Sequence, residues 1–280
     1  MKLCAFADEA SNELHGQIDA LKRNGFSQLE IRGVDGDNIK DISISKAKEI
    51  RKILDSEGIS VFSIGSPIGK YPISDDFSVH LDEFCHVTEL AEILGATRIR
   101  MFSFFPEKGA EPERTKYEVF ERLYRITQNT PSGLILCHEN EKEIFGESDT
   151  ACLEIHKEFS KIRAVFDPAN FVQCGVDTEK AWSVLAPYVE YVHVKDARRD
   201  GTVTLAGDGE GKVETILKNY ISIGGEVVTL EPHLKKFIGL DRLENGSSIK
   251  QEGFYKNCDE AFDTAANRLK SILESIERKD

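Results

Sequence analysis

Four polar residues each stand at the end of a short apolar segment, and their types suit metal binding and proton transfer. They are Glu139, Asp167, His193 and Glu231. Alternate side chains of a strand face opposite sides. Each of the four therefore shares a face with the residue two positions earlier, and that residue is apolar or small in every case. This pattern predicts four buried strands that bring these side chains to one place.

Two glutamates, an aspartate and a histidine supply oxygen and nitrogen ligands for one divalent cation. Carboxylates suit Mg²⁺ and Mn²⁺, and a single imidazole also admits Co²⁺ or Zn²⁺. The alternative is that four unrelated charged residues lie where strands meet solvent. Their matching positions on successive segments favour the metal site.

The segments that carry these residues alternate regularly with helical patterns. Gly25, Gly58 and Gly95 each follow a helical pattern and precede an apolar segment, as expected of a glycine that ends a helix. Eight such strand–helix units predict a (β/α)₈ TIM barrel, whose active site lies at the C-terminal ends of its strands. An open doubly wound sheet is the alternative. We expect one domain over residues 1–280.

Two expectations concern particular segments. The fourth strand is expected to run from Arg98 to Phe105, where Pro106 ends it. The long loop from Lys235 to Asn257 contains the apolar residues Phe237, Ile238, Phe254 and Tyr255. Loops of this length are usually functional, so we expect a lid or an interface element there.

Composition excludes some functions. The 49 acidic and 36 basic residues give a formal net charge of −13, which argues against nucleic acid or an anionic membrane as a partner. The six cysteines form no CxxC pair and are expected to be reduced. Acidic residues follow Met1 too closely for a signal peptide, and no apolar segment reaches 18 residues, so we expect a cytoplasmic protein.

The same segments resemble a known family. The motifs are His-Glu-Asn-Glu-Lys (138–142), Phe-Asp-Pro-Ala-Asn-Phe (166–171), Val-His-Val-Lys-Asp (192–196) and Leu-Glu-Pro-His (230–233). They are similar to those of the sugar phosphate isomerase/epimerase family of xylose isomerase-like barrels, which includes ketose 3-epimerases, hydroxypyruvate isomerases and inosose dehydratases. The resemblance implies that Glu139, Asp167, His193 and Glu231 bind one divalent metal, commonly Mn²⁺, Mg²⁺ or Co²⁺. It also implies that Glu139 and Glu231 are the acid–base pair.

The chemistry of these residues agrees with that resemblance. Removal of a proton beside a carbonyl leaves an enediolate, and a cation that binds its two oxygens stabilises the charge. Two carboxylates on opposite sides can then invert the carbon or interconvert aldose and ketose. We therefore expect a metal-dependent isomerase or epimerase acting on a small sugar or sugar phosphate, with homo-oligomerisation left open. The alternatives are a metal-dependent lyase of the inosose dehydratase type, a phosphodiesterase like the abasic-site endonucleases, and a non-catalytic sugar-binding protein.

Further residues are candidates for contacts with substrate. They are Asn170, Lys195, Arg199, Glu30 and His233. Several epimerases of the family have His where this sequence has Asn170, which donates and accepts hydrogen bonds but relays no proton at neutral pH. His138 faces away from Glu139 and is expected to pack behind the barrel. The glycine-rich segment 207–211 is expected to be a turn before a helix, where a phosphate could bind.

Overall fold

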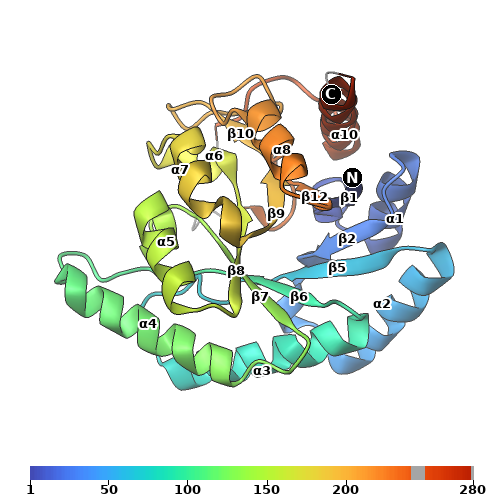
Figure 1. Ribbon diagram of the computed structural model, residues 1–280. Coiled ribbons are helices and arrows are strands. Elements are labelled where there is room, and N and C mark those ends of the chain that lie inside the picture. The colour runs from blue at the N-terminus through green and yellow to red at the C-terminus, as the bar shows by residue number, and fades with distance from the viewer. Residues whose placement is uncertain (241–249, 279–280) are drawn as a thin grey trace.

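The computed structural model describes residues 1–240 and 250–278 of the chain. Eight parallel strands form a closed barrel in the order β1-β12-β9-β8-β7-β6-β5-β2, and helices surround it (Figure 1). The C-terminal helix α10 packs beside α1. The predicted (β/α)₈ barrel is confirmed, and the open doubly wound alternative is wrong, because β1 pairs with both β2 and β12.

The barrel strands are β1 (Lys2–Ala5), β2 (Gln28–Ile31), β5 (Ser60–Gly65), β6 (Arg98–Met101), β7 (Ile135–Glu139), β8 (Ile162–Phe166), β9 (Val189–Val194) and β12 (Val227–Leu230). The helices are α1 (Leu14–Arg23), α2 (Ile44–Glu57), α3 (Phe77–Leu94), α4 (Pro112–Gln128), α5 (Asp149–Glu158), α6 (Pro168–Gln173), α7 (Thr178–Leu185), α8 (Val213–Ser222) and α10 (Cys258–Glu277). Two short hairpins, β3 (Gly33–Val34) with β4 (Asp37–Asn38) and β10 (Asp196–Ala197) with β11 (Val203–Thr204), lie outside the barrel sheet.

Helix α2 shows why the local sequence folds as it does. The Ser43 side chain accepts a hydrogen bond from the Lys46 backbone N–H and so caps the first turn. Ala47, Ile50 and Leu54 recur at helical spacing and are buried. Gly58 ends the helix with a left-handed φ of 70°, as the sequence predicts.

The barrel interior has two chemically distinct levels. An apolar cluster that includes Cys137, Val165 and Tyr191 fills its lower part. These residues lie two positions before Glu139, Asp167 and His193, so the strand alternation read from the sequence is confirmed. Above that cluster, towards the C-terminal ends of the strands, the inward side chains are mainly charged.

The fourth barrel strand is shorter than predicted. Strand β6 ends at Met101 instead of Phe105, because the following residues leave the barrel and pair with the loop after β5. Phe102 donates its backbone N–H to the carbonyl of Ile68 at 2.7 Å, and Phe104 donates to Gly69 at 2.6 Å. The apolar residues 102–105 therefore belong to a loop at the rim of the barrel, which is hydrogen-bonded to the loop after β5 so that the two are interlocked.

The long loop after β12 is partly described. Residues 241–249 lie outside the described residues, so the predicted lid or interface element stays a prediction. Phe237 is buried and its ring lies 5.1 Å from the guanidinium carbon of Arg32, whereas Phe254 is 93% exposed. Residues 250–252 run beside Val203, which exchanges backbone hydrogen bonds with Lys250 and Glu252. None of the helices in the described part of the chain has the length and apolar character required to cross a bilayer.

The interlocked loops give a first prediction. Gly69 has a φ of 80°, and a Cβ there would overlap the carbonyl of Phe102, whereas Gly58 has a φ of 70° and open space around it. Gly58→Ala should cost about 1–2 kcal/mol of unfolding free energy, from the left-handed backbone alone. Gly69→Ala should cost about 1–3 kcal/mol more, because backbone must move. Urea denaturation of both variants measures this, and equal losses would contradict it.

Candidate metal centre

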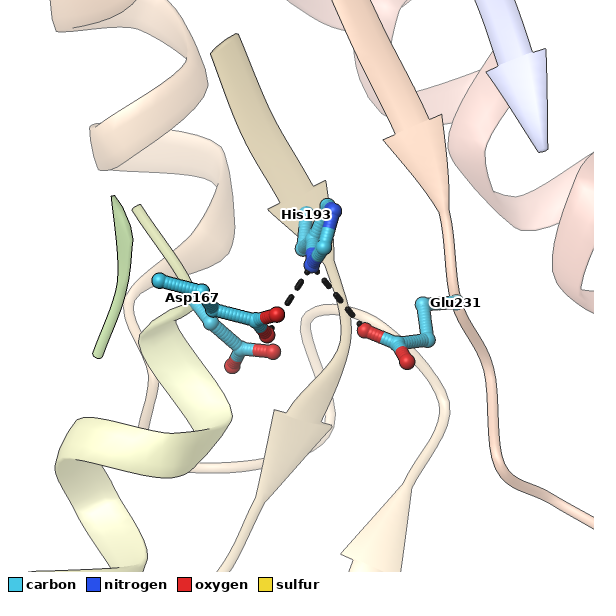
Figure 2. A group of neighbouring side chains, drawn as sticks. Asp167, His193 and Glu231 are labelled. Carbon is cyan, nitrogen blue, oxygen red and sulfur yellow. Dashed lines mark hydrogen bonds and ion pairs between the residues drawn. The ribbon is translucent and has the colours of Figure 1, made fainter. Parts of the chain in front are cut away.

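The structure brings the four predicted ligands together. Glu139, Asp167, His193 and Glu231 are buried, and each offers one ligand atom that lies within 4.8 Å of the others. Figure 2 shows the side chains of Asp167, His193 and Glu231 pointing towards one another from separate strand ends. Glu139 ends β7, Asp167 follows β8, His193 lies in β9 and Glu231 follows β12. Strand closure thus places residues that are far apart in sequence around one point.

His193 is oriented by carboxylates on both ring nitrogens. Its Nδ1 lies 3.0 Å from Glu139 Oε1 and 3.1 Å from Glu231 Oε2. Its Nε2 lies 3.2 Å from Glu30 Oε2, and the Tyr191 hydroxyl donates to Glu30 Oε1 at 2.7 Å. Burial alone would lower the pKa of His193, but the three glutamates raise it well above its ordinary value. Glu30 therefore fixes the imidazole with Nδ1 towards the other ligands.

Glu30 pairs with a base of the site. It is fully buried, with its two oxygens directed at His193 and Tyr191, and its contact with substrate stays a prediction. Sequence alternation correctly places it inside the barrel. The depth at which it lies depends on the barrel geometry.

Asp167 is held by the start of helix α6. Its Oδ1 accepts a hydrogen bond from the Asn170 backbone N–H at 2.8 Å, which caps the helix. Its Oδ2 lies 2.9 Å from Lys195 Nζ. Burial raises the pKa of Asp167 to about 6 against the opposing effect of Lys195, and the nearby Glu139 and Glu231 add to the rise. Asp167 Oδ1 thus stabilises the start of α6, while Oδ2 lies beside Lys195 in the site.

Each of the two glutamates directs one oxygen to His193 and the other to an arginine. Glu139 Oε2 lies 3.2 Å from Arg100 Nε, and Glu231 Oε1 lies 2.7 Å from Arg32 Nη1. Burial raises the pKa of Glu231, but Lys195 and His193 bring it well below its ordinary value. Glu231 is therefore an anion that is held in place on both sides.

A second group of possible ligands is already neutralised. Glu9, Glu231 and His233 also have ligand atoms within 4.8 Å of one another. Arg32 fills this space: its Nη2 lies 3.2 Å from Glu9, its Nη1 contacts Glu231, and it makes two hydrogen bonds with Asp8. Since a guanidinium occupies the position that a second cation would need, the arrangement favours a single metal ion.

The donor set fits a divalent cation. Among the described residues, Asp167 Oδ2 and Glu231 Oε2 are buried without a well-directed hydrogen bond, and their neighbours are the charged groups of Lys195 and His193. The described residues of the barrel mouth bury seven carboxylates against five cationic side chains. The carboxylates are Asp8, Glu9, Glu30, Glu139, Glu141, Asp167 and Glu231, and the cations are Arg32, Lys70, Arg100, Lys195 and the protonated His193. A buried excess of negative charge is costly unless a cation compensates for it.

The other predicted substrate contacts have different outcomes. Asn170 is buried and its side-chain amide donates to Glu139 Oε1 at 3.3 Å and to the carbonyl of Asn140 at 2.9 Å. Lys195 lies beside Asp167, as described above, and His233 Nε2 lies 3.3 Å from Glu231 Oε1. Arg199 is not brought into the site, because its side chain is 81% exposed and pairs with Glu210. Its place in the β10–β11 turn directs it to solvent.

Two further expectations can be decided. His138 is buried outside the ligand group, and its Nε2 lies 3.0 Å from the Ser103 hydroxyl, so its predicted packing role is confirmed. The glycine-rich segment does not offer its backbone to a phosphate. The N–H groups of Gly207, Gly209 and Gly211 all donate to the carboxylate of Asp196, which is fully buried.

Sequence reasoning missed Arg32, Arg100 and the pair of Lys70 with Glu141. Arg98 and Arg100 alternate with the apolar Ile99 and Met101, which pack in the outer core. This alternation was the available signal, since it requires both arginines to face the barrel interior. Lys70 had no such signal, because it belongs to a loop.

Lys70 and Glu141 give a second prediction. Their charged atoms lie 2.8 Å apart and both side chains are almost buried. Burial raises the pKa of Glu141, but Lys70 and two further lysines lower it to about 2. Lys70→Met should therefore cost about 3–5 kcal/mol by leaving a buried carboxylate unpaired, and adding Glu141→Gln should recover much of the loss.

Chemical denaturation of the two single variants and the double variant gives a double-mutant cycle. If the losses of unfolding free energy are additive, the pairing is contradicted. The pH dependence has a definite sign. Because the folded pKa is depressed, the stabilisation by Glu141 is complete above its ordinary value of 4.5 and is lost as pH falls towards 2.

Fold and site together define a (β/α)₈ barrel with a charged ligand cluster at the C-terminal ends of its strands, the usual position of catalytic residues in this fold. The family model of the xylose isomerase-like TIM barrel matches residues 18–231. The chain belongs to this family. No curated protein matches it.

Solved structures agree on the fold. An L-ribulose 3-epimerase superposes with a TM-score of 0.77 at 18% identity, covering 100% of this chain and 96% of that one. The IolI protein with a bound zinc atom gives a TM-score of 0.75 at 16% identity, with 99% of each chain covered. AsbF of Bacillus anthracis, a probable 3-DHS dehydratase, gives a TM-score of 0.72 at 14% identity, covering 96% of this chain and 99% of its own.

Proposed function

We propose that this protein is a divalent-metal-dependent isomerase or epimerase of a small sugar or sugar phosphate. The observation that carries the proposal is the convergence of Glu139, Asp167, His193 and Glu231 at four strand ends of a xylose isomerase-like barrel. Mn²⁺, Mg²⁺, Co²⁺ and Zn²⁺ all accept such a donor set. The similar IolI structure holds a zinc atom, which supports a divalent metal in a barrel of this kind.

The cation, when bound, would act as a Lewis acid that stabilises negative charge developing on two substrate oxygens. The protein supplies the proton transfer. Glu139 and Glu231 come from β7 and β12, which are separated by β8 and β9 in the barrel. A substrate centred between them is approached from two sides, so one glutamate removes a proton and the other returns one.

Neighbouring side chains hold this pair in position. The Asn170 amide and Arg100 contact the two oxygens of Glu139, while His193 and Arg32 contact those of Glu231. Lys195 is the cationic side chain nearest Asp167 and is suited to donate to a substrate oxygen. Fixed donors of this kind favour the charge of the transition state without reorganisation.

A metal-dependent lyase is the second candidate, because AsbF, a probable 3-DHS dehydratase, has a similar barrel. The same proton-abstracting glutamate would serve that reaction, with loss of water in place of proton return. A phosphodiesterase that needs several metals is less compatible with the described part of the chain, where Arg32 fills the second ligand group.

Metal stoichiometry gives the third prediction. The protein should bind one Mn²⁺ per chain, and Asp167→Asn and His193→Gln should each weaken binding at least about 10-fold, since each loses a ligand of full strength. Asn at position 167 can still cap α6, so the first variant should fold. Elemental analysis after gel filtration and titration calorimetry measure the effect. His138→Gln is the matched control, and wild-type affinity in both ligand variants would refute the site.

Solvent exchange gives the fourth prediction. Glu139→Gln and Glu231→Gln should each lower kcat by about 10²–10⁴, the usual contribution of general acid–base catalysis. Wild-type enzyme incubated with ketoses and aldoses in ²H₂O should place deuterium in the product. One single variant should exchange deuterium into the starting sugar while forming no product. Turnover without solvent label would instead indicate a hydride shift, and release of water would indicate the lyase.

A further inference from the structure

Arg100 differs from the other buried cations of the barrel mouth. Arg32 contacts Asp8, Glu9 and Glu231. Lys70 is paired with Glu141, and Lys195 with Asp167. Arg100 has one carboxylate at ion-pair distance among the described residues, Glu139, and that contact uses Nε. Within residues 1–240 and 250–278, its terminal nitrogens Nη1 and Nη2 have no hydrogen-bond acceptor.

This arrangement is costly for a structural residue. Arg100 is only 3% exposed, and among the described residues its Nε–H makes no well-directed hydrogen bond, although Glu139 lies near. A buried donor without an acceptor costs free energy. Arg100 therefore has hydrogen-bond donors that the described residues do not use, and it lies in the mouth of the proposed active site.

The guanidinium is also fixed in orientation. Its central carbon lies 4.5 Å from the centre of the Phe102 ring and 5.5 Å from that of Phe6. Aromatic contacts of this kind hold the planar group in place. A fixed guanidinium with two free nitrogens matches the two oxygens of a carboxylate or phosphate, whereas a sugar hydroxyl needs only one donor.

The position of Arg100 beside the proposed metal ligands indicates that a bound anion would be part of the substrate. Arg100 contacts Oε2 of Glu139, while Oε1 of the same carboxylate lies against His193. Arg100 is thus adjacent to a proposed metal ligand, so a group bound by its guanidinium would belong to the molecule that the site holds.

We propose that Arg100 binds an anionic oxygen group of the substrate, a carboxylate or a phosphate, so that the substrate is an acidic sugar derivative. This inference rests on the proposed function and narrows its substrate class. Arg32, although it contacts the other glutamate, has no part in it because its donors are already used.

The test measures binding of matched acidic and neutral probes to Mn²⁺-loaded protein by titration calorimetry. D-ribonate against ribitol isolates a carboxylate, and D-ribulose 5-phosphate against D-ribulose isolates a phosphate. The wild type should bind the acidic member of one pair at least about 10-fold more tightly, as expected of hydrogen bonds between charged groups. The pair that shows the preference identifies the anion.

Variants assign the preference to Arg100. Arg100→Gln should reduce the ratio of the two dissociation constants to about 1 when both constants are measured at saturating Mn²⁺. Arg100→Lys keeps the charge and loses the fork, so it should retain part of the ratio, and it decides the matter if Arg100→Gln does not fold. Arg98→Gln is the control, because Arg98 lies on the same face of β6 but pairs with Glu190 at 2.7 Å.

The outcomes separate this inference from the proposed function. Absence of Mn²⁺ binding by the wild type contradicts the metal site, and the same ratios measured on metal-free protein then decide the role of Arg100. With metal bound, equal affinity within both pairs, or no binding of any probe, overturns the inference. A preference that survives in Arg100→Gln also overturns it, because the anion is then recognised by the metal or by another cation.

Discussion

The burial of many like charges at one end of the barrel is the constraint on which this structure depends. A buried carboxylate without a partner costs several kcal/mol, so the positions of the acids and of their cations must be specified together. Asp8 and Glu9 meet Arg32, Glu141 meets Lys70, and Asp167 meets Lys195. Glu139 and Glu231 share His193. The resulting network of ion pairs holds each proposed metal ligand in place. The excess of carboxylates favours the binding of a cation at the barrel mouth.

Hydrogen bonds of loop backbone groups support this network of ion pairs from outside the barrel. The loops after β5 and β6 are joined by backbone pairing between residues 68–73 and 102–105. On the opposite side, Asp196 gathers three glycine N–H groups of segment 207–211. Both devices satisfy buried polar groups that loops would otherwise leave to water. The loops at the rim are consequently held by hydrogen bonds to one another. This makes the rim rigid, as a precisely positioned site requires.

The sequence was informative wherever the periodicity of one strand decided the outcome. Glu139, Asp167, His193 and Glu231 could be placed because each ends an apolar segment on its inward face. The partnership of Arg100 with Glu139 could not be read this way, since it joins neighbouring strands whose stagger depends on closure. Glu30 was placed on the correct face, but its depth could not be predicted, and the outward direction of Arg199 depends on a hairpin turn that the sequence pattern did not reveal. The length of β6 was overestimated because apolar loop residues and strand residues look alike.

Phe6 separates the two halves of the site. Its ring lies 4.2 Å from the guanidinium carbon of Arg32, 5.5 Å from that of Arg100, and meets His193 edge-on at 5.2 Å. A side chain at Gly65 would overlap this ring, so the space is reserved for it. The ring thus contacts two guanidiniums that pair with different carboxylates, Arg32 with Glu231 and Arg100 with Glu139. A change at position 6 would therefore reach both guanidiniums and the edge of the His193 ring at once.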